Sequence, residues 1–293
     1  MKILFRTDSS SSIGVGHVMR DLVLAKQLED DEIHFATLEL DGNINHKIPY
    51  PLHKLSSNKP DELIRLIKSL QIELLIVDHY GIGYEFEKEI KTEIPSLKLM
   101  VFDDTYEKHF CDILLNHNIS AKKERYKNLV PKHCELRCGV LFTLIRNEFR
   151  EEKKIYRDKI YDIFIAMGGT DASNINISIL KSLPANLKIC IVTTTMNARL
   201  DELKEFTAPH PNLSLHVDSD EISKLLNQSK FAIITPSVMV HEVLCMEVPF
   251  LAIKVADNQN DMYEYLVKEG YFVLEKFDEN RLKEALKTLK VGS

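Results

Sequence analysis

The feature that most constrains this chain is an alternation of apolar, β-rich runs with amphipathic helical stretches, which stops once and then starts again. In the first half, the pattern predicts strands at residues 3–5, 33–36, 74–77, 97–102 and 111–115, and helices at 18–28, 62–70 and 84–94. In the second half, it predicts strands at 163–167, 189–193, 213–217, 231–234 and 250–253, and helices at 173–182, 219–226, 238–246, 261–268 and 279–289. Nearly continuous apolar strands that alternate with helices are typical of parallel sheets covered on both faces.

A charged stretch, residues 150–159, separates the two series. Domain boundaries commonly fall in exposed polar segments, and 293 residues are enough for two ordinary domains. We therefore expect an α/β protein with two Rossmann-type, doubly wound domains, residues 1–150 and 151–293, that face a central cleft. The last helix could pack back on the first domain. Open parallel sheets bind ligands beyond the carboxyl ends of their strands, so functional residues are expected at those ends.

Composition narrows the class of partner. The formal net charge is −6 and no block of Lys and Arg stands out, so a nucleic-acid partner is not expected. No apolar stretch approaches 18 residues and the N-terminal apolar run is too short for a signal peptide, which favours a cytoplasmic protein without a membrane partner. Five irregularly spaced cysteines suit reduced thiols, and Cys134 and Cys138 with His133 lack the second ligand pair of a structural zinc site. We expect a monomer.

The loop after the first strand contains the most informative residue. Gly14 and Gly16 allow close approach of the backbone to a ligand, and His17 opens the first helix directly after them. The positive end of the helix dipole disfavours imidazolium, and a neutral imidazole is what a general base requires. A dinucleotide-binding fingerprint would place a third glycine at Met19, so NAD is not expected. A lone histidine at this position would more often simply begin or cap the helix, but the flanking glycines and the acidic residues at the strand ends favour a functional role for His17.

Acidic residues follow several predicted strands of the first half, at the same edge as His17: Asp8, Asp78, Asp103 and Asp104. One of them could orient the imidazole and another could bind sugar hydroxyls, although such residues also cap helices. Tyr80 adds a phenol to this edge.

In the second half, the strand at 163–167 runs into Gly168, Gly169 and Thr170 ahead of a predicted helix, an arrangement that favours phosphate binding. The loop lacks the Lys of an ATP-binding P-loop. Hydroxyl, carboxylate and amide side chains follow later strands, and they suit a ribose and a sugar: Thr195, Ser237, Glu242 and Asn258.

Together these residues resemble the GT-B superfamily of nucleotide-sugar enzymes, and more closely the PseG-type UDP-2,4-diacetamido-2,4,6-trideoxy-β-L-altropyranose hydrolases of pseudaminic acid synthesis. The resemblance covers essentially the whole chain, through the order and spacing of residues 5–9, 14–17, Arg20, 76–81, 102–104, 111–116, 137–139, 144–146, 167–171, Glu242 and 258–259. Pro236 and His241 depart from the family pattern around Glu242.

The resemblance implies UDP bound mainly by the second domain and the sugar facing the first. It implies that His17 is the base that activates water, with Tyr80 and Asn258 near the sugar. The full set expected to bind substrate is Asp8, Gly14, Gly16, Arg20, Asp78, Tyr80 and Asn258. The set expected to bind the nucleotide is Gly168, Gly169, Thr170, Thr195, Ser237 and Glu242.

The expected reaction is attack of water on the anomeric carbon with departure of UDP and inversion, without a cofactor or a metal. Three alternatives stay open: a GT-B glycosyltransferase in which a sugar or lipid acceptor replaces water, a UDP-sugar-hydrolysing 2-epimerase, and a non-catalytic nucleotide-sugar-binding protein.

Overall fold

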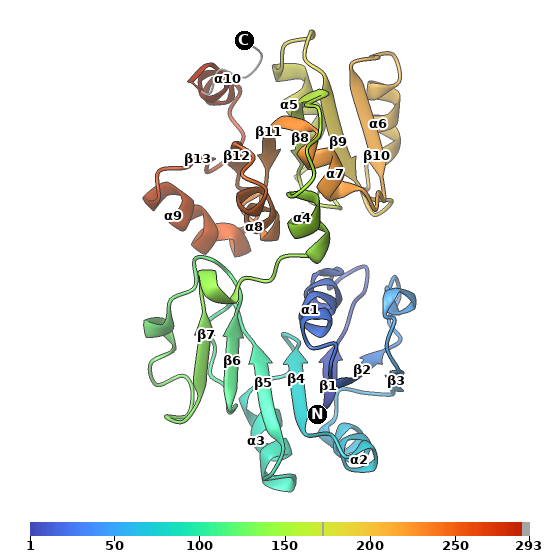
Figure 1. The fold of residues 1–293 in the computed structure, drawn as a ribbon, viewed down its shortest axis with the longest axis vertical. Coiled ribbons are helices and arrows are strands. Elements are labelled where there is room, and N and C mark those ends of the chain that lie inside the picture. Colours follow the sequence, from blue (N-terminus) through green and yellow to red (C-terminus); the bar gives the residue numbers. More distant parts are fainter. Residues whose placement is uncertain (172, 289–293) are drawn as a thin grey trace. The chain divides into compact units, whose positions relative to one another are not determined.

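The computed structural model describes residues 1–171 and 173–288, and the chain divides into two compact units, Met1–Leu144 and Ile145–Ser293. Each unit is built on one parallel sheet (Figure 1).

The sheet of the first unit has seven strands in the order β3-β2-β1-β4-β5-β6-β7. The strands are β1 (Lys2–Thr7), β2 (Glu32–Leu38), β3 (Leu52–Leu55), β4 (Leu74–Asp78), β5 (Lys98–Phe102), β6 (Ile113–Asn116) and β7 (Glu135–Cys138). The helices are α1 (Gly16–Gln27), α2 (Pro60–Leu70) and α3 (Tyr84–Glu93), with short 3-10 turns at η1 (Asn45–Lys47), η2 (Lys123–Tyr126) and η3 (Val140–Phe142). The order reverses between β1 and β4, which is where open α/β sheets bind ligands.

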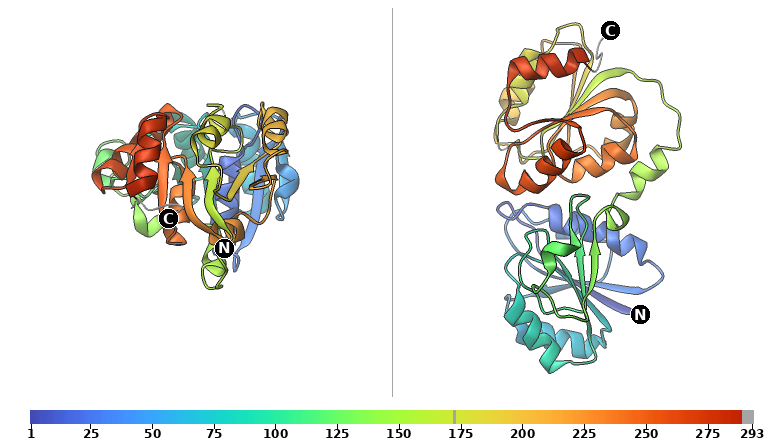
Figure 2. Two further views of the ribbon diagram at one scale, coloured as in Figure 1. Left: turned by 90° about the horizontal axis from the view of Figure 1, so that it is seen from above. Right: turned by 90° about the vertical axis from the view of Figure 1, so that its left-hand side faces the viewer.

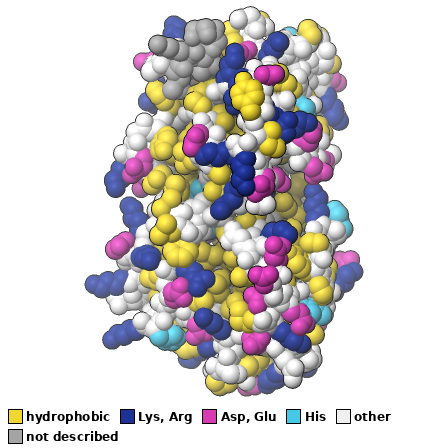
Figure 3. Space-filling view, viewed as in Figure 1, with side chains coloured by type: hydrophobic (Ala, Val, Ile, Leu, Met, Phe, Trp, Pro, Cys, Tyr) yellow, Lys and Arg dark blue, Asp and Glu magenta, His cyan; other side chains and the backbone are white. Residues whose placement is uncertain are grey.

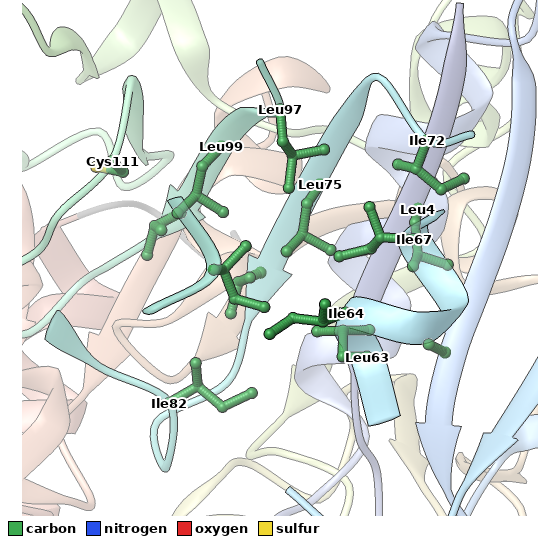
Figure 4. Close-up of a cluster of buried hydrophobic side chains, with 14 of the residues drawn as sticks. Leu4, Leu63, Ile64, Ile67, Ile72, Leu75, Ile82, Leu97, Leu99 and Cys111 are labelled. Atoms are coloured by element: carbon green, nitrogen blue, oxygen red, sulfur yellow. The ribbon is translucent and has the colours of Figure 1, made fainter. Parts of the chain in front are cut away.

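Helices cover both faces of this sheet because side chains alternate along each strand. On one face, Leu63 and Ile67 of α2 pack on Leu4 and Leu75 (Figure 4). On the other face, Val18 of α1 joins a separate core made by the intervening strand residues, such as Ile3, Phe5 and Ile76. Burying each such aliphatic side chain contributes about 1.5–3 kcal/mol. The core that contains Val18 holds α1, and therefore His17, against the carboxyl ends of β1 and β4.

The sheet of the second unit has six strands in the order β10-β9-β8-β11-β12-β13. The strands are β8 (Tyr161–Ala166), β9 (Ile189–Thr193), β10 (Leu213–Val217), β11 (Ser229–Ile234), β12 (Phe250–Ile253) and β13 (Phe272–Leu274). The helices are α4 (Asn147–Glu152), α5 (Asn176–Ser182), α6 (Leu200–Thr207), α7 (Ile222–Asn227), α8 (Val238–Cys245), α9 (Asn260–Lys268) and α10 (Glu279–Thr288), with a 3-10 turn η4 (Asp257–Gln259). The strand order again reverses, here between β8 and β11, and two further views show the layers of each unit (Figure 2).

The expected boundary at residue 150 falls inside α4, which belongs to the second unit. Phe149 of this helix is fully buried, and α4 contacts α7 and α8. At the other end of the unit, α10 contacts α5, and Leu282 and Leu286 lie in the core of the second unit. The apolar face of the last helix is therefore used within its own unit. The expected final residue of this helix, Leu289, lies outside the described residues.

Five strands and helices were not expected from the sequence: the strands β3, β7 and β13, and the helices α4 and α6. The three strands end a sheet, and each has only three or four residues. An edge strand is half solvated, so its sequence lacks the continuous apolar run that identified the central strands. The eight residues of α6 are too few for a clear helical period.

The surface carries charges of both signs. On the face drawn in Figure 3, Lys and Arg side chains are interspersed with Asp and Glu side chains, without a large field of one sign. Within residues 1–171 and 173–288, no helix is both long and apolar enough to cross a membrane.

Candidate active site

His17 lies in the first turn of α1, above the point where the first sheet reverses its order. Its side chain is buried, with 6% of the residue exposed. Nδ1 lies 2.7 Å from Oδ1 of Asp78, the last residue of β4. The Tyr80 ring meets the imidazole edge-on, with ring centroids 4.6 Å apart and an interplanar angle of 77°. Of the acidic residues that follow strands, Asp78 is thus the one that orients His17.

Arg20 ties this pair to a second carboxylate. Its Nε donates to Oδ2 of Asp78 at 2.5 Å, and its NH1 donates to Oδ2 of Asp104 at 3.1 Å. Tyr80 donates from its hydroxyl to Oδ1 of Asp104 at 3.0 Å. Arg20 and His17 are three residues apart on α1, so both point from the same face of the helix. These contacts form a closed network: Tyr80 binds Asp104, Asp104 binds Arg20, Arg20 lies against His17, and the His17 ring contacts Tyr80.

The charges in this network are strongly coupled. Burial opposes ionisation of Asp78, but Arg20 and the bond from His17 outweigh it and hold the pKa of this carboxyl well below its usual range. Burial likewise opposes the charge on Arg20, and Asp78 more than compensates, which raises the pKa of the guanidinium. Partial burial and the adjacent Asp104 carboxylate raise the pKa of the Tyr80 phenol to about 12. Asp78 and Arg20 are therefore ionised, and Tyr80 keeps its proton.

The tautomer of His17 follows from these contacts. The 2.7 Å contact with an ionised Asp78 requires a proton on Nδ1, since a carboxylate can only accept. NH2 of Arg20 also lies 3.0 Å from Nδ1, but an unprotonated Nδ1 would bring its lone pair against the ionised Asp78 oxygen, which can only accept. We therefore assign the proton to Nδ1, which leaves the lone pair on Nε2 for chemistry.

Asp8 proves to be a structural residue of this edge. It is buried, and its two oxygens accept from Arg6 at 2.8 and 2.7 Å, from the Leu38 amide at 2.7 Å and from Nε2 of His79 at 3.1 Å. These four bonds use the four lone-pair positions of a carboxylate. Burial opposes its ionisation, yet the bonds from His79 and Arg6 hold the pKa of Asp8 well below its usual range. No acceptor position is left for a sugar hydroxyl.

The loop before α1 is held in a tight turn. The Gly14 amide donates to the Ser10 carbonyl at 2.8 Å, and the Ser10 amide donates back at 3.2 Å. Gly14 has a φ of +85°, which a side chain would strain. Gly16 is exposed, and a Cβ added there would meet nothing within 4 Å. The loop thus presents open backbone beside His17.

In the second unit, Gly168, Gly169 and Thr170 form an exposed turn after β8. Gly168 has the same φ of +85° as Gly14. The Gly169 carbonyl accepts from the Thr193 hydroxyl at 3.2 Å and from the Thr194 hydroxyl at 2.9 Å, which fixes the turn on the end of β9. The turn can therefore offer its amides to an anionic ligand.

The helix expected to follow this turn at residue 173 begins only at Asn176, in α5. The amides of Ile175 and Asn176 donate to Asp171, at 3.2 and 3.4 Å. Asp171 and Asn174 have φ values of +41° and +53°, so the chain turns away before the helix starts. The amides at the start of α5 therefore bind Asp171, and phosphate binding stays a prediction for the Gly168–Thr170 turn alone.

Glu242 is buried in α8, with 3% of its surface exposed. Nε of Arg146 donates to Oε1 of Glu242 at 2.7 Å. The guanidinium carbon of Arg146 also lies over the Phe149 ring, 4.6 Å from its centroid. Burial raises the pKa of Glu242, and Arg146 opposes that rise. The position that the sequence assigned to ribose binding is therefore a buried ion pair in which Arg146 occupies Oε1.

The remaining expected residues of the second unit follow its other strands. Thr195 is exposed after β9, and its amide donates to Asp218 at 3.2 Å. Ser237 precedes α8, with its hydroxyl 2.9 Å from that of Thr235. Asn258 is exposed in η4. All three lie after the carboxyl ends of β9, β11 and β12, at the same edge of the sheet as the glycine turn.

All five cysteines, which fall within the described residues, are free thiols. Cys134 lies beside Cys111, with the sulfur atoms 3.6 Å apart. Among residues 1–171 and 173–288, no group of three or more His, Cys, Asp or Glu side chains could hold a metal ion.

Sequence reasoning missed Arg6, whose side chain holds Asp8. The signal was present, since Arg6 follows Ile3, Leu4 and Phe5 in a strand that should be buried on both faces. A charged residue at such a position is retained only with a partner. The sequence placed Arg146 only within the motif at residues 144–146. Its contact with Glu242 was not predicted, because a partner 96 residues away cannot be recognised from spacing.

Known proteins resemble the chain in sequence and in fold. It is 48% identical over 277 residues to UDP-2,4-diacetamido-2,4,6-trideoxy-β-L-altropyranose hydrolase of Campylobacter jejuni, which covers 94% of this chain and 100% of that protein. It is 20% identical over 274 residues to spore coat polysaccharide biosynthesis protein SpsG of Bacillus subtilis, covering 90% and 80% of the two chains. No family model matches the chain.

Two solved structures show the fold. Acinetobacter baumannii MurG superposes with a TM-score of 0.63 at 14% identity, over 99% of this chain and 90% of that one. The structure of Anabaena Alr3699/HepE in complex with UDP and glucose superposes with a TM-score of 0.63 at 13% identity, over 100% of this chain and 90% of that one. The two parallel α/β sheets, of seven and six strands, thus make a GT-B-like fold.

Proposed function

The chain belongs to the family of UDP-2,4-diacetamido-2,4,6-trideoxy-β-L-altropyranose hydrolases, and we propose that it cleaves this sugar nucleotide with His17 as the general base. It is a nucleotide-sugar hydrolase of the pseudaminic acid pathway. Its products are UDP and 2,4-diacetamido-2,4,6-trideoxy-L-altrose. The observation that supports the assignment of the base is the 2.7 Å contact between Nδ1 of His17 and Asp78.

In the proposed reaction, Nε2 of His17 takes a proton from water as the water oxygen attacks the anomeric carbon. The bond from that carbon to the diphosphate oxygen breaks, and UDP leaves with the bonding electrons. Asp78 keeps the imidazole in the required tautomer and stabilises the imidazolium that forms. Attack from the face opposite UDP inverts the anomeric configuration. General-base assistance of this kind contributes about 10²–10⁴-fold in rate.

The neighbouring charges favour this proton transfer. Before the transfer, Arg20 is positive while Asp78 and Asp104 can carry two negative charges beside it. A proton on His17 would bring these four groups to electrical balance. Because the groups are already fixed by hydrogen bonds, little reorganisation is needed when the charge appears.

Each unit offers further residues for the rest of the substrate. We propose that Arg20, Tyr80 and the backbone at Gly14 and Gly16 contact the sugar, together with Asn258. Asp8 supports this set through Arg6 and His79 and does not itself bind the sugar. The amides of Gly168–Thr170 would receive the diphosphate, and Thr195, Ser237 and Glu242 the nucleoside. The free thiols suit a cytoplasmic enzyme, and we propose that it acts as a monomer.

The direct test is to incubate the protein with a panel of UDP-sugars, without an acceptor, and to measure free UDP. We expect release of UDP from the diacetamido-trideoxy sugar and little from UDP-glucose. Release that requires an added sugar or lipid acceptor would identify a glycosyltransferase, and binding without release would identify a nucleotide-sugar-binding protein.

A second experiment fixes the bond that breaks. Hydrolysis in ¹⁸O-labelled water should place the label in the sugar, because water attacks carbon. NMR of the first-formed anomer should show inversion and an altro product, whereas a changed configuration at C2 would identify a 2-epimerase. Label in UDP would mean attack at phosphorus, and the proposed mechanism would then be wrong.

A further inference from the structure

A third carboxyl group lies beneath the His17–Asp78 pair. Asp21 is four residues after His17 on α1, so the two side chains share one face of the helix. Thr7 ends β1 and pairs in register with Asp78 of β4. Phe5 and Ile76, two residues earlier on each strand, lie in the core under α1, so Thr7 and Asp78 point toward α1 as well. Asp21, Thr7 and Asp78 therefore converge between the helix and the sheet.

Asp21 is buried in an unusual way. Its exposed fraction is 0%, and neither carboxyl oxygen has a hydrogen-bond partner. The Thr7 hydroxyl beside it is also buried without a partner. An ionised carboxylate in this position would lose its hydration, and the Thr7 hydroxyl and Arg20 compensate for only part of that loss. Asp8 and Asp78, by contrast, each accept several bonds from Arg or His side chains.

The charges that face Asp21 reinforce the effect of burial. From β4, the Asp78 carboxylate disfavours a second negative charge nearby, and burial together with Asp78 raises the pKa of Asp21 well above its usual range. From β1 the Thr7 hydroxyl opposes this, and so does Arg20 on α1, but both effects are smaller. Two close carboxyl groups cannot both ionise readily, and here Arg20 and His17 keep Asp78 as the ionised one.

We propose that Asp21 is a permanently protonated carboxylic acid that positions Asp78 for its work on His17. The acid hydrogen is a donor, and the acceptors on its side of the helix are the Thr7 hydroxyl and the Asp78 carboxylate. A hydrogen bond from the Asp21 acid to the Thr7 and Asp78 acceptors holds Asp78 from the side of Asp21. His17 and Arg20 donate to Asp78 from the other side. Asp21 is a positioning residue and does not touch the substrate. The inference rests on the proposed role of His17.

The protonation state can be measured without reference to activity. Difference infrared spectroscopy of the full chain at neutral pH should show the carbonyl stretch of a protonated carboxyl group, and Asp21→Asn should remove it. Glu87→Gln is the matched control, because Glu87 is an equally buried carboxyl that accepts from His109 and from the Phe110 amide. The control should leave the band in place. Absence of an Asp21-dependent band would overturn the proposal even if His17 proves essential.

The positioning role is tested by kinetics. Asp21→Asn keeps the shape and a donor, so kcat should stay within about twofold of wild type. Asp21→Leu removes the donor, and kcat should fall about tenfold with KM and UDP affinity unchanged. If Asp21→Leu does not fold, as judged by circular dichroism, Asp21→Ala serves instead as the donor-free variant and should lower kcat in the same way.

Equal kcat values for Asp21→Asn and the donor-free variant would overturn the positioning role. So would a tenfold loss in Asp21→Asn alone, since that would mean the carboxyl proton or charge acts directly. A failure of the role proposed for His17 gives a different signature, because His17 variants would then retain activity while the infrared band of Asp21 persists. A failure of the proposed function would leave the wild-type protein without UDP release while the band persists.

Discussion

The two sheet edges of this protein handle charge in opposite ways. In the first unit, the carboxyl groups at the strand ends, Asp8, Asp78 and Asp103, are buried among donors, and their pKa values are lowered despite burial. In the second unit, burial dominates, and the pKa values of Asp171 and Glu242 are raised. The first edge thus holds several ionised groups in fixed positions, whereas the second offers mainly backbone amides and hydroxyls, with Glu242 paired to Arg146.

This difference matches the proposed division of labour. Moving a proton to His17 requires fixed charges that need not rearrange, and the first unit holds Asp78 and Arg20 in place. Binding a nucleoside diphosphate requires several hydrogen-bond donors that can reach its phosphate oxygens together. The Gly168–Thr170 turn supplies such donors as backbone amides, without a bulky cationic side chain. Asp21 is the exception in the first unit, since it is neutral and sits behind the charged network.

The largest effect should come from removing the base. His17→Asn should lower kcat at least about 10²-fold, because general-base assistance is lost. UDP affinity, measured by calorimetry, should stay unchanged, since the proposed nucleotide contacts are all in the second unit. His53→Asn on β3 is the control histidine and should keep wild-type turnover. A His17→Asn enzyme with normal kcat would remove the distinction between a catalytic and a binding unit.

The next effect should fall on nucleotide binding. Glu242→Ala should weaken UDP binding about 10- to 100-fold, because the ribose hydroxyls lose a charged acceptor worth about 1.5–3 kcal/mol. Calorimetric titration with UDP measures it directly. Glu247→Ala, at an exposed glutamate of the same unit, should bind UDP normally. Unchanged affinity in Glu242→Ala would restrict Glu242 to its ion pair with Arg146.

The response to acid should differ between the units. Lowered carboxyl pKa values stabilise the fold above the unfolded pKa of about 3.9, and this contribution is lost as pH falls through the lower folded values. Raised pKa values act in the opposite sense. Burying the Asp171 and Glu242 carboxyl groups therefore costs the folded state less in acid, where these groups are protonated. At about pH 3, hydrogen exchange corrected for intrinsic rates should rise first in the first unit. Earlier exchange in the second unit would contradict the electrostatic comparison.

The smallest effect should come from the Tyr80 hydroxyl. Tyr80→Phe keeps the ring against His17 and loses only the bond to Asp104, so kcat should fall by no more than about threefold. Tyr80→Ala also removes the ring and should be slower than Tyr80→Phe. Steady-state kinetics of the two variants separates the contributions. A large loss in Tyr80→Phe would mean that the hydroxyl takes part in catalysis.

Much of the site could be read from the order of residues. Three features of the site are local sequence patterns: the acidic residues at strand ends, the Gly14–Gly16 loop and the glycine turn after β8. Such patterns can be recognised without knowledge of the fold. The errors came from contacts that cross the chain. Nothing near Asp8 in sequence indicates that Leu38 and His79 fill its acceptor positions, so it was expected to bind substrate.

The sequence alone determined the two α/β halves, the family and the position of the candidate base, because buried parallel strands and short loop motifs leave periodic and compositional traces. Tertiary structure decided which acid serves His17 and which acids are occupied elsewhere. Asp78, Asp8 and Asp21 are the same residue type at similar depth, and they differ only in the donors that surround them. Those donors come from strands and helices far apart in the chain, and the ionisation of a carboxyl group depends on such neighbours rather than on its own identity.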